Sequence, residues 1–173
     1  MKKLIKNGFI VDGSGNKGYR ADVLINGDRI EKIGENIKAN DAKIIDAKGL
    51  VVAPGFIDTH SHSDLQILIE PEVMPKVMQG ITTEMLGQDG ISMAPLPVEY
   101  ISPWRKNLAG LDGDSDEIDW TYKDTAGYLS MIEKVGPGLN ECYLVPHGNI
   151  RMEAMGLDNR QPTEEELNKM VEI

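Results

Sequence analysis

Nine residues decide how this chain is expected to fold: Pro54-Gly55-Phe56-Ile57-Asp58-Thr59-His60-Ser61-His62. Side chains alternate between the two faces of an extended strand, so His60 and His62 point to the same face. Imidazole nitrogen is the commonest metal ligand in proteins, and two imidazoles on one face can hold one ion between them. The spacing therefore predicts a metal site, although two histidines near a strand end also occur as ordinary half-buried residues.

The same run lies where an α/β barrel builds its active site. Residues 50–53 and 56–57 are apolar and predict two strands, which a Pro-Gly break separates. His60 and His62 then follow the carboxyl end of the second strand. Because the active sites of α/β barrels lie at the carboxyl ends of the strands, the position and the chemistry agree.

The composition is that of a water-soluble globular protein, since 40% of the 173 residues are hydrophobic and 27% are charged. The formal net charge of -10 argues against nucleic acid as a partner, because phosphate binding needs a basic face. No run approaches the roughly 20 apolar residues of a membrane span, and the apolar stretch at the start is too short for a signal peptide. The sequence therefore predicts a cytoplasmic protein that binds neither nucleic acid nor membrane.

Cys142 is the single cysteine, so no internal disulfide can form. A chain of this length buries enough apolar surface to fold without one. Cys142 lies in an apolar segment, residues 141–145, that predicts a buried strand. A packed thiol is expected there rather than a catalytic one.

Residues 1–53 differ from the rest of the chain in their pattern of apolar and turn-forming residues. They hold short alternating segments separated by turns, and Asn26-Gly27-Asp28 predicts a hairpin between two strands. From residue 54 onward strands alternate with helices, which is typical of a parallel sheet in an α/β protein. The chain is therefore predicted to consist of an N-terminal β segment, residues 1–53, and an α/β segment, residues 54–173.

The α/β segment is too short for a closed barrel. Three strand–helix units are predicted, with strands at 56–57, 81–87 and 141–145 and helices at 72–79, 124–135 and from 163 onward. A (β/α)8 barrel needs eight such units over about 250 residues. We therefore expect either a fragment of a longer polypeptide or a chain that a second chain completes, and we favour the fragment.

Four further segments, taken with the His60–His62 strand, resemble one branch of the amidohydrolase superfamily, the N-acyl-D-amino-acid deacylases or D-aminoacylases. They read Gln-Gly-Ile-Thr-Thr at 79–83, Gly-Gln-Asp-Gly-Ile-Ser-Met-Ala-Pro at 87–95, His-Gly-Asn-Ile-Arg at 147–151 and Arg-Gln-Pro-Thr-Glu-Glu-Glu-Leu at 160–167. The resemblance covers nearly the whole chain and concerns the N-terminal portion of such an enzyme. It implies part of a small β-sandwich at residues 1–53, then the first part of the metal-dependent amidohydrolase TIM-like barrel, truncated at residue 173.

The resemblance implies zinc as the cofactor, as one or two ions, with other divalent ions as alternatives. The family segment that matches residues 87–92 often holds a zinc-ligating cysteine, and the corresponding residue here is Asp89. A carboxylate oxygen can replace the thiolate, but as a harder donor it holds zinc less tightly and tolerates other divalent ions better. The expected metal ligands are His60, His62 and Asp89, unless residues 88–90 form only a turn.

Other polar residues are candidates for the substrate site or for orienting the ligands. His147 follows the third strand and is expected at the same end of the sheet as His60 and His62, where it binds substrate, orients a ligand or has a structural role. Asp58 shares the strand face of His60 and either accepts the spare imidazole hydrogen or is solvated. Glu84 within the second strand is expected to be salt-bridged. Residues 112–119 are acidic but lack the ligand order of an EF-hand, so they predict a solvated loop.

The resemblance implies a metal-dependent amidohydrolase that acts on C–N bonds other than peptide bonds, here the amide bond of small-molecule N-acyl-D-amino acids. The general base, further histidine ligands and the basic group for the substrate carboxylate are expected beyond Ile173, so residues 1–173 alone should be inactive. One alternative is a cyclic-amide hydrolase of the dihydroorotase or hydantoinase type, which also opens with a His-x-His strand. The other is a non-catalytic barrel subunit that needs a partner chain.

Overall fold

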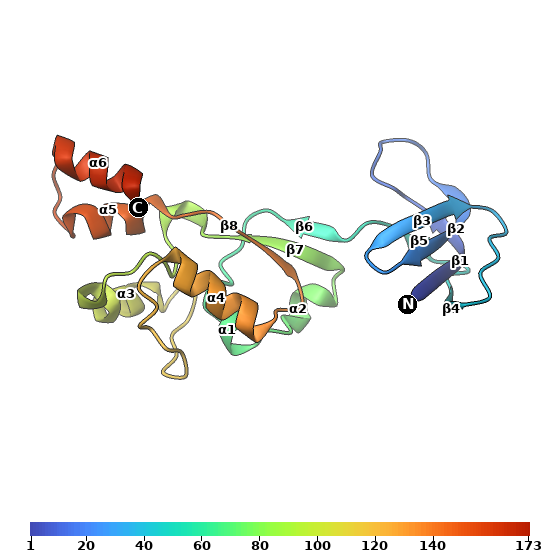
Figure 1. Ribbon diagram of the computed structural model, residues 1–173, viewed down its shortest axis with the longest axis horizontal. Helices are drawn as coiled ribbons and strands as arrows, with labels where there is room; N and C mark the ends of the chain where they lie inside the picture. Colours follow the sequence, from blue (N-terminus) through green and yellow to red (C-terminus); the bar gives the residue numbers. More distant parts are fainter. The chain divides into compact units, whose positions relative to one another are not determined.

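The structure is a computed structural model that describes all of residues 1–173. Two compact units make up the chain, Met1–Pro54 and Gly55–Ile173 (Figure 1). The first unit is a β-sheet with its connecting turns, and the second combines a sheet with helices. The boundary falls at the Pro-Gly break in the sequence.

The first unit is built on one five-stranded sheet. Its strands are β1 (Lys2–Ile10), β2 (Tyr19–Asn26), β3 (Arg29–Gly34), β4 (Ala42–Asp46) and β5 (Val51–Val52). The order is β3-β2-β1-β4, and β5 also pairs with β1. β1 runs antiparallel to β2 and parallel to β4 and β5. Asn26 faces Arg29 across the tight turn between β2 and β3, so the predicted hairpin is confirmed.

Both faces of this sheet carry small apolar clusters, one around Leu4 and one around Ile10. An irregularity between Ile5 and Gly8 separates them along β1, because one extra residue moves the following side chains to the opposite face. Asp22 is buried nearby, and its carboxylate accepts hydrogen bonds from backbone N–H groups. Burying this carboxylate is tolerated because it is hydrogen-bonded.

The second unit contains a three-stranded parallel sheet in the order β6-β7-β8. Its strands are β6 (Phe56–Asp58), β7 (Ile81–Leu86) and β8 (Asn140–Tyr143). Its helical segments are α1 (Gln66–Ile69), α2 (Met74–Val77), η1 (Gln88–Gly90), η2 (Val98–Tyr100), α3 (Ile101–Leu108), α4 (Thr125–Val135), α5 (His147–Met155) and α6 (Glu164–Glu172). The predicted alternation of strands and helices and the parallel pairing are confirmed.

Capping residues mark the ends of two helices. α4 begins after Asp124, whose side chain accepts a hydrogen bond from the Gly127 N–H at 2.8 Å, and it ends at Gly136 in the left-handed conformation. α6 begins after Thr163, which forms a reciprocal capping box with Glu166. α3 and α5 start without a side-chain cap, and the sequence did not predict them. None of the helices has the length and apolar character that a membrane span requires.

Two local expectations are wrong. The helix predicted at residues 72–79 is shorter, because Val73 lies at a left-handed φ of 43° and α2 begins only after it. Cys142 is exposed rather than packed in a core, since its side chain lies on the face of β8 opposite the buried cluster. Alternate residues of a strand face opposite sides, and the neighbouring Tyr143 packs against that cluster.

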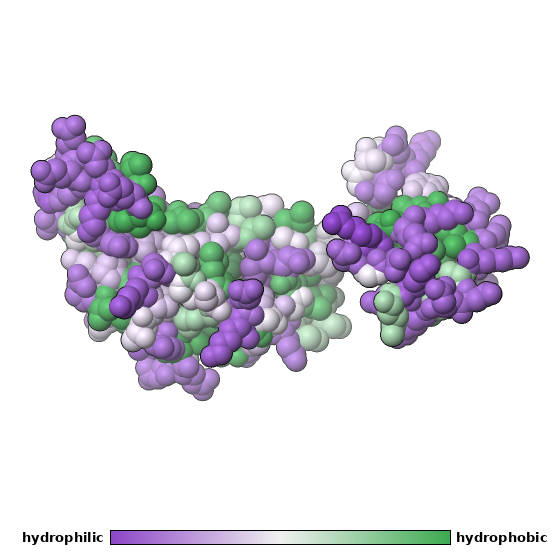
Figure 2. Space-filling model, in the orientation of Figure 1, coloured by the Kyte–Doolittle hydropathy of each residue, from purple (hydrophilic) through white to green (hydrophobic).

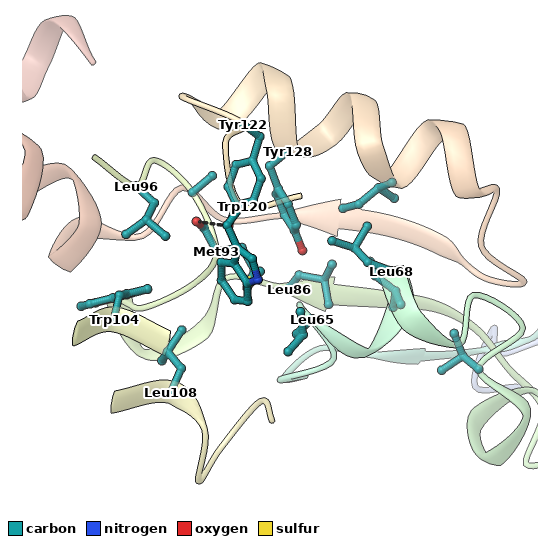
Figure 3. Packing of buried hydrophobic residues seen from close by; sticks show 14 of the residues in the cluster. Leu65, Leu68, Leu86, Met93, Leu96, Trp104, Leu108, Trp120, Tyr122 and Tyr128 are labelled. Atoms are coloured by element: carbon teal, nitrogen blue, oxygen red, sulfur yellow. Dashed lines mark hydrogen bonds between the residues drawn. The ribbon is translucent and has the colours of Figure 1, made fainter. Parts of the chain in front are cut away.

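The core of the second unit lies between the sheet and the helices (Figure 3). Tyr128 of α4 and Leu86 of β7 are fully buried in it. The Tyr128 hydroxyl donates to the Asp64 carbonyl at 2.7 Å, and the Tyr122 ring lies 5.8 Å from the Tyr128 ring, centroid to centroid. Aromatic side chains of this size bury about 150–250 Å² each. This core therefore holds α4 and the segment after β6 against the strands.

Several large apolar side chains near the ends of β6 and β8 are exposed, namely Phe56, Ile57, Leu144 and Val145. Figure 2 shows hydrophobic residues along the side of the second unit where Figure 1 draws β6 and β8. Parallel sheets are normally covered on both faces. These side chains are thus a surface that the described residues leave uncovered.

Candidate metal centre

His60 and His62 lie in the turn that follows β6, not within the strand. β6 ends at Asp58, and the Ser61 N–H donates to the Met85 carbonyl of β7 at 3.2 Å. This bond places both histidines beside the carboxyl end of β7. Their ring centroids are 5.3 Å apart, and the side chain of His60 is 58% exposed whereas that of His62 is 18% exposed.

Asp89 completes a group of three candidate ligands. It lies in η1, directly after β7, at a left-handed φ of 58° that aspartate tolerates better than most residues. Its Oδ2 lies 3.1 Å from His62 Nε2 and 3.3 Å from His60 Nε2. The structure thus brings together the three residues that the sequence indicates as metal ligands.

These separations fit a zinc ion. Zinc bonds to nitrogen and oxygen are roughly 2.0–2.2 Å long, so neighbouring atoms of a tetrahedral site lie about 3.3 Å apart. Both distances from the imidazole nitrogens to Asp89 Oδ2 are close to this value. Two imidazoles and one carboxylate are donors that zinc accepts. A hydrogen bond joins His62 Nε2 to Asp89 Oδ2 in this structure.

Glycines let the turn that carries Asp89 pack tightly against its neighbours. Gly87 has a φ of 75°, and a Cβ at this position would collide with the Leu144 carbonyl that follows β8. A Cβ on Gly148, in the first turn of α5, would lie 2.6 Å from the Gly90 carbonyl oxygen. Because neither glycine has a side chain, η1 lies close to both β8 and α5, and this contact sets the direction of Asp89.

A second acidic group lies on the other side of the His62 ring. His62 Nδ1 is 3.8 Å from Asp112 Oδ1, and Asp64 offers an oxygen within 4.8 Å of both. Asp64 is fully buried, and its Oδ1 accepts hydrogen bonds from the Gly87 N–H and the Ser92 hydroxyl. Burial raises the pKa of Asp64 although these hydrogen bonds lower it. Burial, together with the charge of Asp64, raises the pKa of Asp112 to about 7.

Asp112 corrects the expectation of a solvated loop at residues 112–119. Its side chain is 2% exposed, and its backbone N–H donates to the Leu108 carbonyl at the end of α3, at 2.9 Å. Asp116 behaves as expected, because its side chain is 95% exposed and pairs with Arg105. The loop is therefore solvated in part, and its first acidic residue faces the candidate metal centre.

Lys76 of α2 ties the histidine turn to β7. Its Nζ donates to Asp58 Oδ2 at 2.8 Å, to Ser61 Oγ at 2.6 Å and to the buried Glu84 carboxylate. The bond from Lys76 lowers the pKa of Asp58. Burial lowers the pKa of Lys76, but its bonds to Asp58 and Glu84 outweigh burial and raise it. Asp58, two residues before His60, and Ser61, directly after it, are thus held by one charged group.

Asp58 bonds to the backbone of His60 rather than to an imidazole ring. Its Oδ1 accepts the His60 N–H at 3.3 Å, so it orders the turn and not the ring tautomer. Glu84 is salt-bridged as predicted, through Lys76. Its neighbour across the sheet, Glu141 of β8, has both carboxylate oxygens buried without a partner. Burial, together with the nearby Glu84, raises the pKa of Glu141 to about 7.

His147 belongs to neither group of candidate ligands. It is the first residue of α5 and lines a cavity of about 610 Å³ with Arg151 and Arg160. Arg151 donates to the carbonyls of Asp158 and Arg160, so it is occupied in shaping the loop before α6. His147 therefore lies near the start of a helix that packs on the Asp89 turn, without contacting Asp89.

Sequence reasoning missed two residues of this region, Lys76 and Asp112. Lys76 carries no local signal, because a lysine in a short helix is ordinarily solvated. Asp112 is 50 residues from His62 along the chain, and only the packing of α3 brings it near the ring. Neither contact follows from spacing in the sequence.

Parallel strands that gather two histidines and an aspartate at their carboxyl ends define an α/β protein with a candidate metal centre. A protein-family model described as "Amidohydrolase family" matches residues 43–173. This match covers more than half of the chain, so the chain belongs to the amidohydrolase family.

The resemblance to N-acyl-D-amino-acid deacylases is confirmed by similar proteins. The chain is 40% identical to an N-acyl-D-glutamate deacylase of Alcaligenes xylosoxydans xylosoxydans, over 96% of this chain and 33% of that protein. It is 36% identical to a D-aminoacylase of the same organism, over 98% of this chain and 34% of that protein. An N-acyl-D-glutamate deacylase of Bordetella bronchiseptica, solved with zinc and a phosphonate inhibitor, has a TM-score of 0.83 at 36% identity, over 98% of this chain and 34% of that one. The chain spans about one third of the length of these relatives.

A more local likeness concerns the dihydroorotase alternative. A dihydroorotase of Streptococcus thermophilus (strain CNRZ 1066) is 56% identical, but over 59 residues that make up 34% of this chain and 14% of that protein. The deacylases match over nearly the whole chain. The comparison therefore favours the deacylase branch.

Proposed function

We propose that this chain carries metal ligands of a zinc-dependent hydrolase that cleaves the amide bond of N-acyl-D-amino acids. The observation that carries the proposal is the group His60, His62 and Asp89, whose separations suit zinc at the carboxyl ends of parallel strands. Similarity to N-acyl-D-glutamate deacylase over 96% of the chain supports the substrate class. Because the chain spans one third of that relative, the activity is proposed for the complete protein, and residues 1–173 alone are expected to be inactive.

We infer that residues 54–173 form the first part of a (β/α)8 barrel and that residues 1–53 form part of a small β-sandwich. Three parallel strands with helices on one face support the barrel, as do the uncovered apolar side chains of β6 and β8. The five-stranded sheet supports the sandwich, in which a second sheet would cover one face. The remaining barrel strands, from the same polypeptide or a second chain, are the proposed partner of the exposed sheet face.

The residues of this chain position ligands rather than move protons. Zinc at this site would polarise the scissile carbonyl and lower the pKa of the attacking water. Lys76 fixes the turn around His60, and Gly87 and Gly148 let the η1 turn that carries Asp89 pack closely against its neighbours. His147 is proposed to contact substrate or to orient a ligand from the start of α5. The general base is proposed to lie outside residues 1–173.

The test is made on the complete protein, as wild type and as His60→Ala/His62→Ala. We expect zinc to copurify with the wild type and to be lost from the variant, together with release of D-amino acid from N-acetyl-D-glutamate and N-acetyl-D-leucine. Metal content is measured by mass spectrometry and product by a chiral amine assay. A matched control is Asp119→Asn, which removes an exposed carboxylate whose only side-chain hydrogen bonds are local, to Thr121.

The same preparations separate the rival functions. Hydrolysis of hydantoin or dihydroorotate without hydrolysis of acetylated D-amino acids assigns the cyclic-amide alternative. The third outcome is a protein that binds no metal and hydrolyses none of these substrates, both alone and when mixed with a second chain that carries the rest of the barrel. This outcome indicates a non-catalytic subunit and refutes the proposed function. Cytoplasmic location and the lack of a nucleic-acid or membrane partner stay predictions from composition.

A further inference from the structure

The His62 ring lies between two carboxylates that contact its two nitrogens differently. Asp89 faces Nε2 at hydrogen-bonding distance, whereas Asp112 faces Nδ1 at 3.8 Å. His62 Nδ1, Asp112 Oδ1 and Asp64 Oδ2 are all buried and lack a hydrogen-bond partner. Buried polar atoms without partners are rare in folded proteins, so three that face one another call for an explanation.

The chemistry of a metal-bound histidine supplies that explanation. A neutral imidazole carries one hydrogen, and if Nε2 gives its lone pair to a metal, the hydrogen must lie on Nδ1. The Nδ1–H group then needs an acceptor, and a carboxylate is the usual one. Asp64 Oδ2 and Asp112 Oδ1 both lack a partner, but Asp112 Oδ1 is the one that the ion-pair contacts place beside Nδ1, at 3.8 Å. Asp112 also forms no side-chain hydrogen bond, whereas Asp64 Oδ1 accepts hydrogen bonds from Gly87 and Ser92. Asp112 is therefore the acceptor in position to receive the Nδ1–H.

We propose that Asp112 is a positioning residue that accepts the Nδ1–H of His62 and so directs Nε2 toward the metal. This inference rests on the proposed function, because it assumes that His62 binds a metal. A movement of about 0.8 Å brings the two atoms from 3.8 Å to hydrogen-bonding distance. The backbone bond from Asp112 to Leu108 keeps the carboxylate near the ring.

The proposal distinguishes the two histidines. His60 is largely exposed, and its only polar side-chain contact is with Asp89, through Nε2. No protein group therefore selects its tautomer. His62 is mostly buried, and Asp112 lies on the side of the ring away from Asp89. The chain thus orients His62, but not His60, before a metal binds. Through Asp112, loop 109–124 is part of the metal centre.

The test compares Asp112→Ala, Asp112→Asn and Asp119→Asn in the complete protein. Zn²⁺ affinity is measured by competition with a chromophoric chelator, and the visible spectrum is recorded with Co²⁺ in place of zinc. We expect Asp112→Ala to weaken Zn²⁺ binding 10–100-fold and to change the Co²⁺ spectrum, because removing an outer-shell partner of a ligand has effects of this size. Asp112→Asn keeps an oxygen acceptor and should recover much of the affinity. Asp119→Asn should match the wild type.

Thermal unfolding of the metal-free proteins separates positioning from a structural role. A positioning role predicts that Asp112→Ala melts no lower than the wild type while it binds zinc more weakly. Unchanged zinc affinity and an unchanged Co²⁺ spectrum in Asp112→Ala would overturn the proposal. So would an Asp112→Ala variant that loses a second bound metal ion while the first binds as in the wild type. A wild type that binds no metal refutes the proposed function itself, which is a different result from failure of Asp112.

Discussion

At the scale of single residues, Asp89 combines a special backbone conformation with a place facing two imidazoles. Its φ of 58° and ψ of 15° lie in the left-handed region, which aspartate and asparagine reach more easily than other residues with a Cβ. Its carboxylate is a hard donor, whereas the related enzymes, as the resemblance implies, often have a softer thiolate at this position. The residue therefore affects the stability of the η1 turn and the choice of metal.

Replacing Asp89 with cysteine should raise the preference for zinc and lower the stability of the η1 turn. We expect Asp89→Cys to raise the preference for Zn²⁺ over Mn²⁺ by about tenfold or more, because thiolate favours the softer ion. We also expect a loss of about 1 kcal/mol of stability, since cysteine is less favourable at a left-handed φ. Chelator competition with each metal and urea unfolding of the metal-free protein measure these effects. Asp89→Asn keeps the backbone preference but loses the charge, and should weaken binding of both metals.

At the scale of secondary-structure elements, helix α2 holds the histidine turn through Lys76. Glu84 is fully buried, so removing its cationic partner leaves a charge without compensation. We expect Lys76→Met to lower the free energy of unfolding by about 3 kcal/mol, measured by urea unfolding. Lys2→Met serves as the control, because its partners Glu31 and Asp41 are exposed and each such pair contributes about 0–1 kcal/mol.

The double variant Lys76→Met/Glu84→Gln shows whether the buried charge is the cause. Part of the lost stability should return, because the amide at position 84 can stay neutral beside the methionine. If the single Lys76 variant is as stable as Lys2→Met, α2 does not hold the turn and the position of His60 must depend on other contacts.

The elements also show what local sequence can predict. β7, α4 and α6 follow from apolar periodicity and capping residues, because these signals lie within the element itself. The expectation for the short helix α2 fails at one residue, Val73, whose left-handed φ no propensity indicates. The grouping of His60 and His62 with Asp89 was predictable from strand ends. The contacts of Asp112 and Lys76 were not, since they depend on how distant segments pack.

At the scale of the whole molecule, the distribution of acidic groups sets how stability depends on pH. Most carboxylates of this acidic chain are exposed, but Asp112 is buried and the half-buried Glu141 has both carboxylate oxygens shielded from solvent, and their pKa values are raised to about 7. A carboxyl whose pKa is higher in the folded than in the unfolded protein binds its proton more tightly when folded. Its contribution to stability is fully present below the unfolded pKa and is lost as pH rises through the folded one.

Glu141 gives a test of this effect away from the metal ligands. Its ordinary pKa of 4.5 rises to about 7 because of burial and the nearby Glu84, with Lys76 opposing the rise. We therefore expect metal-free protein to lose up to about 3 kcal/mol of stability from this group between pH 4.5 and 7. Urea unfolding at pH 5 and pH 7 measures the loss.

Glu141→Gln should show a smaller difference in stability between the two pH values, whereas Glu133→Gln, at an exposed position of α4, should behave as wild type. Equal pH dependence in Glu141→Gln and wild type would mean that Glu141 stays ionised in the folded protein, so that burial does not hold its proton.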